Sequence, residues 1–135
     1  MNNGYIQRNK DGEYTGELII EGVNVSPIEG MYFKENDNNY LWIKRKKILE
    51  YDDKKSKFIR RERFPILEVY LKKEVGKTYN YIGTFMFLRF KFLIYGIWDR
   101  NMVQTKRLNL YVERLPMREQ NVIVSINKIK TNGNN

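Results

Sequence analysis

The sequence predicts an all-β protein: a single antiparallel barrel of about eight or nine strands, or a two-layer sandwich, with little or no helix. Three observations lead to this prediction. No segment has a sustained apolar spacing of i, i+3, i+4 and i+7, which a helix needs on its buried face. Many short segments instead alternate apolar and polar residues, or are apolar between turn-forming residues. These turns recur at intervals of roughly 8–14 residues, as is typical of barrels and sandwiches.

Turn-forming residues separate the strands expected in the first part of the chain. Residues 10–12 (Lys-Asp-Gly) are a turn, because glycine takes positive φ without steric cost. Pro27 and Gly30 bracket a bend, and residues 36–39 (Asn-Asp-Asn-Asn) make a hairpin turn. The strands between these turns are expected at Gly4–Asn9, Tyr14–Glu21, Met31–Glu35 and Tyr40–Tyr51.

The second part of the chain alternates strands and polar connections in the same way. Residues 52–57 are a polar turn, and Pro65 breaks or bulges the next strand because proline donates no ladder hydrogen bond. Gly76 closes a turn, residues 99–106 form a loop, and residues 115–121 form a turn that contains a proline. Strands are expected at Phe58–Arg63, Ile66–Lys73, Arg107–Glu113 and Val122–Ile129, with one bent strand or two strands in Tyr79–Trp98.

The apolar segment in the middle of Tyr79–Trp98 predicts two strand faces. By strict alternation, one face is wholly apolar and consists of Met86, Leu88, Phe90, Phe92 and Ile94. The opposite face holds two cations flanked by apolar residues, namely Phe85, Phe87, Arg89, Lys91, Leu93 and Tyr95. In a barrel, this second face is the one expected to line a cavity for a small ligand.

The chain of 135 residues is long enough for one domain whose core needs no covalent support. We expect residues 1–130 to form this domain, and residues 131–135, which lack an apolar anchor, to form a disordered tail. The N-terminus lacks the charged and apolar regions of a secretion signal. The longest apolar stretch is interrupted by Arg89 and Lys91, which disfavours a membrane span. A cytoplasmic protein without a membrane partner is expected.

The absence of two residue types excludes most catalytic chemistry. With no Cys and no His, the chain has no disulfide, thiolate ligand, thiol nucleophile or imidazole base. Asp52 and Asp53 lie in a solvated turn, and Glu68 with Lys72 fits an ordinary ion pair on one strand face better than a nuclease centre. We therefore expect no enzyme activity, no metal and no cofactor.

Positive charge is concentrated in one segment. The chain carries a net charge of +9, and residues 41–63 contain ten Lys or Arg but only four Asp or Glu. This segment reads as two strands joined by a polar turn, so residues 44–47 are expected across a hairpin from Arg60, Arg61 and Arg63. Like charges that face each other destabilise a sheet, and an anionic partner would account for the cluster.

Aromatic residues interleave with these cations and predict a binding surface. Tyr40 and Trp42 have the same strand parity as Lys44 and Lys46, which places stacking rings and phosphate-binding cations on one strip. The leading hypothesis is a non-enzymatic protein that binds single-stranded nucleic acid or another anionic macromolecule. Its candidate contact residues are Tyr40, Trp42, Lys44, Lys46, Lys47, Arg60, Arg61 and Arg63.

Three alternatives stay open at this point. In the first, the cations pair with neighbouring acids and protect an edge hairpin against aggregation. In the second, the Trp, Tyr and Arg content belongs to a structural or protein-interaction subunit of a virus (phage) or mobile element, with a protein as its partner. The third is a small-ligand-binding barrel that uses the face described above.

Overall fold

The strands account for most of the part of the chain that the computed structural model describes, which is residues 2–118 and residue 120. These residues confirm the expected all-β class. The strand expected at Val122–Ile129 and the tail at 131–135 lie outside the described residues. The strands are β1 (Gly4–Arg8), β2 (Tyr14–Ile20), β3 (Val23–Asn24), β4 (Ile28–Glu35), β5 (Asn38–Arg45), β6 (Ile48–Asp52), β7 (Lys57–Arg61), β8 (Glu68–Lys73), β9 (Tyr81–Phe87), β10 (Phe90–Trp98) and β11 (Leu108–Arg114).

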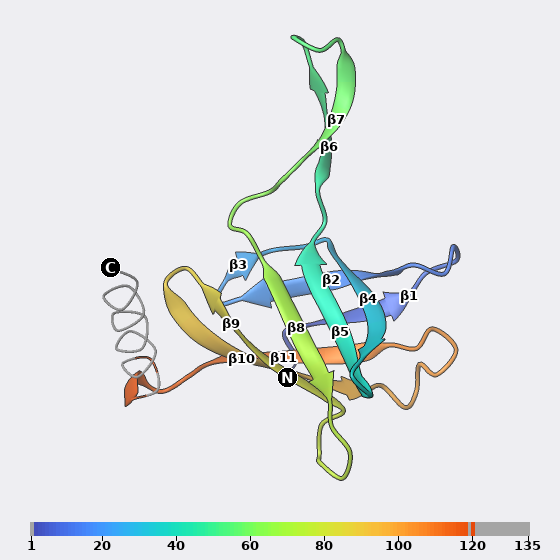
Figure 1. Cartoon of the computed structure of the whole chain (residues 1–135), viewed down its shortest axis with the longest axis vertical. Coiled ribbons are helices and arrows are strands. Elements are labelled where there is room, and N and C mark those ends of the chain that lie inside the picture. The colour runs from blue at the N-terminus through green and yellow to red at the C-terminus, as the bar shows by residue number, and fades with distance from the viewer. Residues whose placement is uncertain (1, 119, 121–135) are drawn as a thin grey trace.

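A closed antiparallel barrel of eight strands forms the body of the molecule (Figure 1). The strands follow the order β1-β11-β10-β9-β8-β5-β4-β2, and β2 pairs with β1 to close the ring. The short strand β3 pairs with β2 outside this ring. Of the two architectures left open by the sequence, the barrel is therefore the one that forms. No helix among the described residues is long and apolar enough to cross a membrane.

Two glycines make the closing pair of strands possible. Gly4 and Gly16 lie on β1 and β2, opposite Leu18 and Ile6 respectively. A Cβ atom at Gly16 would overlap the backbone carbonyl of Tyr5, and one at Gly4 would overlap the carbonyl of Glu17. Because glycine has no Cβ, the two strands can cross at this distance.

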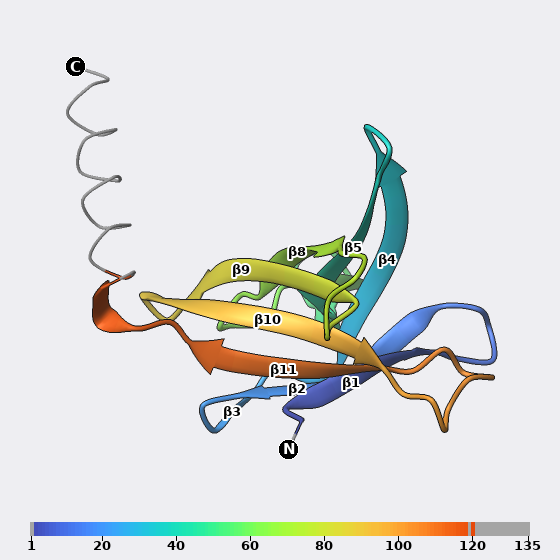
Figure 2. The same ribbon diagram turned by 90° about the horizontal axis from the view of Figure 1, so that it is seen from below.

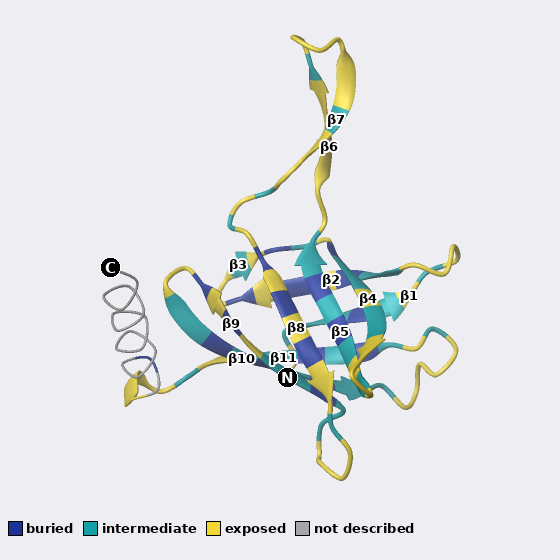
Figure 3. Ribbon diagram, viewed as in Figure 1, coloured by how far each residue is buried: buried dark blue, intermediate teal, exposed yellow. Residues whose placement is uncertain are grey.

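Every second residue of the barrel strands points into one apolar core, and Figure 3 shows this alternation along β5 and β8. Burying these side chains is the main force that holds the ring together. The outward-facing residues of the same strands stay partly or fully exposed, so that they are available to a ligand. The fully buried side chains include Ile6, Leu18, Ile20, Ile28, Leu41, Ile43, Leu71, Phe92, Ile94, Leu108 and Leu110.

The segment Tyr79–Trp98 forms two strands, β9 and β10, joined by a two-residue turn. Both turn residues have positive φ, 48° at Leu88 and 72° at Arg89, and the turn pairs Phe87 with Phe90. Positive φ at both positions is the geometry of the tight hairpin turn whose twist matches the strands it joins.

This turn overturns the two faces expected for the segment. Because Phe87 pairs with Phe90, odd-numbered residues before the turn lie on the same face as even-numbered residues after it. Met86 is therefore exposed, while Phe85 and Phe87 pack against Phe92 in the core. The expected apolar face from Met86 to Ile94 is therefore wrong. The cavity expected beside Phe85 and Phe87 is wrong too, because these rings fill the core.

β6 and β7 form a separate hairpin that projects from the barrel between β5 and β8 (Figure 1). The single strand expected at Tyr40–Tyr51 is therefore wrong: β5 ends at Arg45, and β6 begins at Ile48. β5 pairs with β4 and β8, while β6 pairs only with β7. Arg60 and Arg61 face Leu49 and Ile48 rather than lysines. The expected opposition of Arg60 and Arg61 to lysines across the hairpin does not occur.

β4 begins at Ile28, so the bend expected between Pro27 and Gly30 ends earlier than predicted. β4 pairs with β2 only over Ile28–Gly30, and its remaining residues pair with β5 alone. The two strands therefore diverge beyond Gly30. This divergence leaves an open corner between the turn that joins β1 to β2 and the outer face of β4 and β5.

Candidate nucleic-acid interface

Four aromatic side chains form a platform on the outer face of β4, β5 and β8. Because Leu41 and Ile43 point inward, their neighbours on β5 point outward. The register places Trp42 opposite Tyr70 of β8, and their rings stack with centroids 5.9 Å apart and planes at 5°. A second stacked pair lies beside it, with centroids 5.3 Å apart. We call these four residues, Phe33, Tyr40, Trp42 and Tyr70, the aromatic platform.

The platform is open to solvent on one side and carries a cation at its edge. Tyr70 is 52% exposed, although its ring is large and apolar. The Lys44 ammonium lies 4.8 Å from the Trp42 ring centroid and 3.6 Å from the Glu29 carboxylate. The Trp42 Nε1 is covered and has no hydrogen-bond partner among the described residues.

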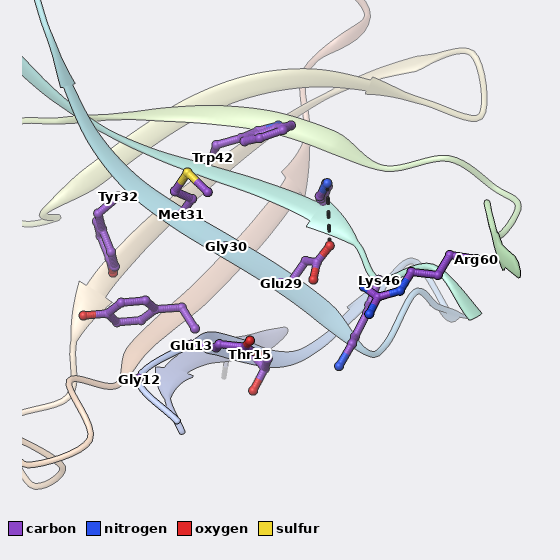
Figure 4. Close-up of a pocket in the computed structure, with 12 residues that line it drawn as sticks. Gly12, Glu13, Thr15, Glu29, Gly30, Met31, Tyr32, Trp42, Lys46 and Arg60 are labelled. Atoms are coloured by element: carbon purple, nitrogen blue, oxygen red, sulfur yellow. Dashed lines mark ion pairs between the residues drawn. The ribbon is translucent and has the colours of Figure 1, made fainter. Parts of the chain in front are cut away.

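A groove of about 550 Å³ lies in the open corner next to this platform (Figure 4). One wall comes from the turn between β1 and β2, and the other from β4 and β5. Figure 4 shows Lys46 and Arg60 at one end and Tyr32 at the other. We call it the corner groove, and its lining residues are Gly12, Glu13, Tyr14, Thr15, Glu29, Gly30, Met31, Tyr32, Trp42, Lys44, Lys46 and Arg60.

Charge in the corner groove is only partly neutralised. Glu29 is paired with Lys44, whereas Lys46 and Arg60 have no ion-pair partner in the described part of the chain. Arg60 reaches the groove from β7, so the projecting hairpin contributes directly to this wall. Glu13 adds a second carboxylate, so the three cations and two carboxylates of the groove leave a net charge of +1 next to the aromatic platform.

The structure places five of the eight residues expected at the site on one surface and the other three elsewhere. Four of them line the corner groove, namely Trp42, Lys44, Lys46 and Arg60. Tyr40 lies on the same outer face of β5, stacked on Phe33. The remaining three do not line this groove, and each has a partner elsewhere; they are Lys47, Arg61 and Arg63.

The partners of these three residues are protein acids and a backbone carbonyl. Lys47 lies 3.7 Å from Glu62. Arg61 forms ion pairs of 3.2 Å with both Glu50 and Asp52. The Arg63 guanidinium donates a hydrogen bond of 2.9 Å to the carbonyl of Ser26, which holds the base of the hairpin to the barrel.

Arg45 reinforces that attachment. Its guanidinium donates to the carbonyls of Pro65 and Asn24, at 3.2 and 3.4 Å. Burial lowers the pKa of Arg45, and the nearby charge of Arg63 lowers it further. The two arginines therefore act at the hairpin base, where they contact backbone and not the groove.

Sequence reasoning missed Phe33, Tyr70 and Met31 as members of this surface. The parity signal was present for Tyr70, which alternates with the buried Val69 and Leu71. The contact of Tyr70 with Trp42 could not be predicted, because it depends on β8, and not the chain segment directly after β5, being the neighbour of β5.

Comparison with known proteins finds no similar protein. Neither the protein-family models, nor the curated proteins, nor the solved structures contain a match to this chain.

Proposed function

We propose that this chain is a non-enzymatic protein that binds single-stranded nucleic acid. Bases stack on the aromatic platform, and the backbone phosphates follow the corner groove. The observation that carries the proposal is the outward, near-parallel stack of Trp42 and Tyr70, with Lys44 over the indole and, beyond it, two cations that have no ion-pair partner among the described residues. Exposed rings beside a basic groove are the combination by which single strands are bound without sequence readout.

A single strand fits this surface better than a duplex. Stacking on a protein ring requires a base whose face is free, and in a duplex both faces are already stacked. The described part of the chain also contains no helix of the length that reads a major groove. Selectivity for unpaired bases is therefore expected, with tolerance of their sequence.

The test compares two tyrosines that each stack on a neighbouring ring on the outer face of the barrel. Tyr70→Ala removes half of the Trp42 stack. Tyr111→Ala is the matched control, because Tyr111 stacks on Tyr95 at 5.1 Å and 8° on the outer face of β11, three strands away. Fluorescence anisotropy of a labelled single-stranded oligonucleotide measures the affinity of each variant, with duplex DNA in parallel.

Loss of one stacked base costs about 1–3 kcal/mol, so Tyr70→Ala is expected to weaken single-strand binding about 5- to 150-fold. Tyr111→Ala is expected to leave the affinity within about twofold, because it lies outside the platform. Equal losses in the two variants, or a preference for the duplex, would contradict the proposal.

The projecting hairpin supports a second candidate function, contact with a protein. One face of the hairpin exposes large apolar side chains, with Leu49 at 67% and Phe58 at 64%. Phe58 packs only edge-to-face on Tyr51, at 5.2 Å. Exposed apolar groups gathered on one face are typical of protein interfaces. Analytical ultracentrifugation of the wild type and of Leu49→Glu/Phe58→Glu tests the simplest partner, a second copy of the chain.

A further inference from the structure

A second pocket lies at one end of the barrel, next to the corner groove, with which it shares Tyr14 and Tyr32. The loop between β10 and β11 stands beside the turn between β1 and β2 at this end (Figure 2). The backbone N–H of Arg8 donates to the carbonyl of Thr105 at 2.8 Å, which fixes the loop to the barrel rim. Together the loop and the strand ends border an open pocket of about 630 Å³. Small-molecule sites have volumes of roughly 300–1,000 Å³.

Four aromatic rings line the inner part of this pocket. Tyr32 lies at their centre, with its ring centroid 4.8 Å from that of Tyr14, 5.6 Å from Tyr81 and 6.2 Å from Trp98. Trp98 meets Tyr81 edge-to-face at 6.0 Å. The outer part is apolar too, with Met102 and Val103 from the loop. Such walls favour a flat apolar ring, which would offset-stack or meet the ring edges.

The rim of the pocket is positively charged. Arg100, Lys106 and Arg107 line it, and none of them forms an ion pair within the described part of the chain. Arg107 is held in place by stacking 3.8 Å above Tyr5. Arg100 and Lys106 are exposed and free to turn toward a bound molecule.

The single carboxylate of the pocket does not cancel this charge. Asp99 accepts hydrogen bonds from the backbone N–H of Asn101 in the loop at 3.0 Å and from the Asn109 amide on β11 at 3.3 Å. Three cations against one carboxylate leave the pocket with a net positive charge, which disfavours an organic cation, although aromatic rings alone would attract one. The rim selects an anion.

We propose that this pocket binds a small molecule in which a planar aromatic ring is joined to an anionic group, such as a nucleoside monophosphate. The ring enters the aromatic pocket, and the anionic group meets Arg100 and Lys106. This site is separate from the aromatic platform, and it stands whether or not the chain binds nucleic acid.

The two tryptophans of the chain make the sites separately observable, because Trp98 lines this pocket and Trp42 belongs to the platform. In Trp42→Phe, all tryptophan fluorescence comes from Trp98. This variant is titrated with adenosine monophosphate, adenosine, inorganic phosphate, benzoate and tetraethylammonium. The same series is repeated in Trp42→Phe/Arg100→Gln/Lys106→Gln, whose two added substitutions replace exposed side chains and leave the core intact.

Adenosine monophosphate is expected to change Trp98 fluorescence saturably, and adenosine to bind about tenfold more weakly for want of the anionic group. The Arg100→Gln/Lys106→Gln substitutions are expected to bring adenosine monophosphate down to the affinity of adenosine and to leave adenosine unchanged. A response to benzoate as strong as that to the nucleotide would assign the pocket to aromatic carboxylates within the same class. Three outcomes would overturn the proposal. They are no saturable response to adenosine monophosphate or benzoate, equal binding of adenosine monophosphate and adenosine, and stronger binding of tetraethylammonium than of adenosine monophosphate.

Discussion

Two pairs of neighbouring cations give the sharpest test of the corner groove. Lys46 and Arg60 line the groove without an ion-pair partner among the described residues. The residue that directly follows each of them in sequence does have a partner. Lys47 is paired with Glu62, and Arg61 is paired with Glu50 and Asp52. The variants Lys46→Gln/Arg60→Gln and Lys47→Gln/Arg61→Gln remove the same charge from the same segment. They therefore change the long-range field of the +9 chain equally and differ only in local contact.

The expected size of the difference follows from counterion release. For single strands, the logarithm of the binding constant falls by about 0.7 per phosphate contact for each unit of log salt. Loss of the two groove contacts is expected to reduce this slope by about 1.4, whereas the control variant keeps the wild-type slope. Over a fourfold rise in salt, the wild-type affinity is expected to fall about sevenfold more than that of Lys46→Gln/Arg60→Gln.

Anisotropy titrations at four salt concentrations, with one labelled single strand, measure all three slopes. Thermal unfolding of each variant serves as the control for folding. Both pairs are surface residues, so the variants are expected to differ little in stability, by about 0.5 kcal/mol. If both variants lose slope equally, the +9 charge acts as a diffuse field, and the corner groove has no special part in binding.

Three further predictions concern the barrel itself. Burial raises the pKa of Tyr32 above its ordinary value near 10, so the folded chain resists an ionisation that the unfolded chain undergoes, and stability is lost as pH rises past that value. Tyr32→Phe is expected to lessen this loss at high pH. At pH 7 it is expected to be neutral or stabilising by up to about 1 kcal/mol in urea unfolding, because it removes a buried hydroxyl that has no partner among the described residues. A large destabilisation would contradict this. Gly16→Ala is expected to destabilise by about 3 kcal/mol, because its Cβ meets the Tyr5 carbonyl where the barrel closes, and a loss below about 1 kcal/mol would show that the strands give way easily. Leu88→Asn/Arg89→Gly is expected to stabilise by about 1–2 kcal/mol by relieving positive φ at two ordinary residues, and an unchanged melting temperature would contradict that reasoning.

The fold class was predictable because it depends on local alternation. In the strand expected at Ile66–Lys73, Val69 and Leu71 alternate with Glu68, Tyr70 and Lys72, and both are buried. The neighbours of each strand were not predictable, since they depend on which loop leaves the barrel. β5 pairs with β8, although the separate hairpin of β6 and β7 lies between them in sequence. Nothing in residues 46–67 marks that hairpin as a projection rather than as a continuation of the sheet.

The same limit explains the errors at single residues. A two-residue turn at Leu88 and Arg89 changed the parity of everything before it, and neither residue is one that such turns favour. Lys46 and Lys47 are indistinguishable in sequence, yet one lines the groove and the other pairs with Glu62. Charge density indicated the segment that carries these cations, but only the register of the hairpin shows which of them have an ion-pair partner among the described residues.

The two stacked aromatic pairs on the outside of the barrel separate a stabilising contact from a binding surface. Tyr95 and Tyr111 stack at least as closely as Trp42 and Tyr70. A cross-strand pair of this kind stabilises a sheet by about 0.2–1 kcal/mol, and this alone explains why either pair exists. What distinguishes the Trp42 pair is its surroundings: Lys44 over the indole, a groove beside it and unpaired cations at the end of that groove. Among the described residues, no cation lies over Tyr95 or Tyr111. Ring geometry is thus common to both pairs, and the case for nucleic-acid binding rests on the charge that accompanies only one of them.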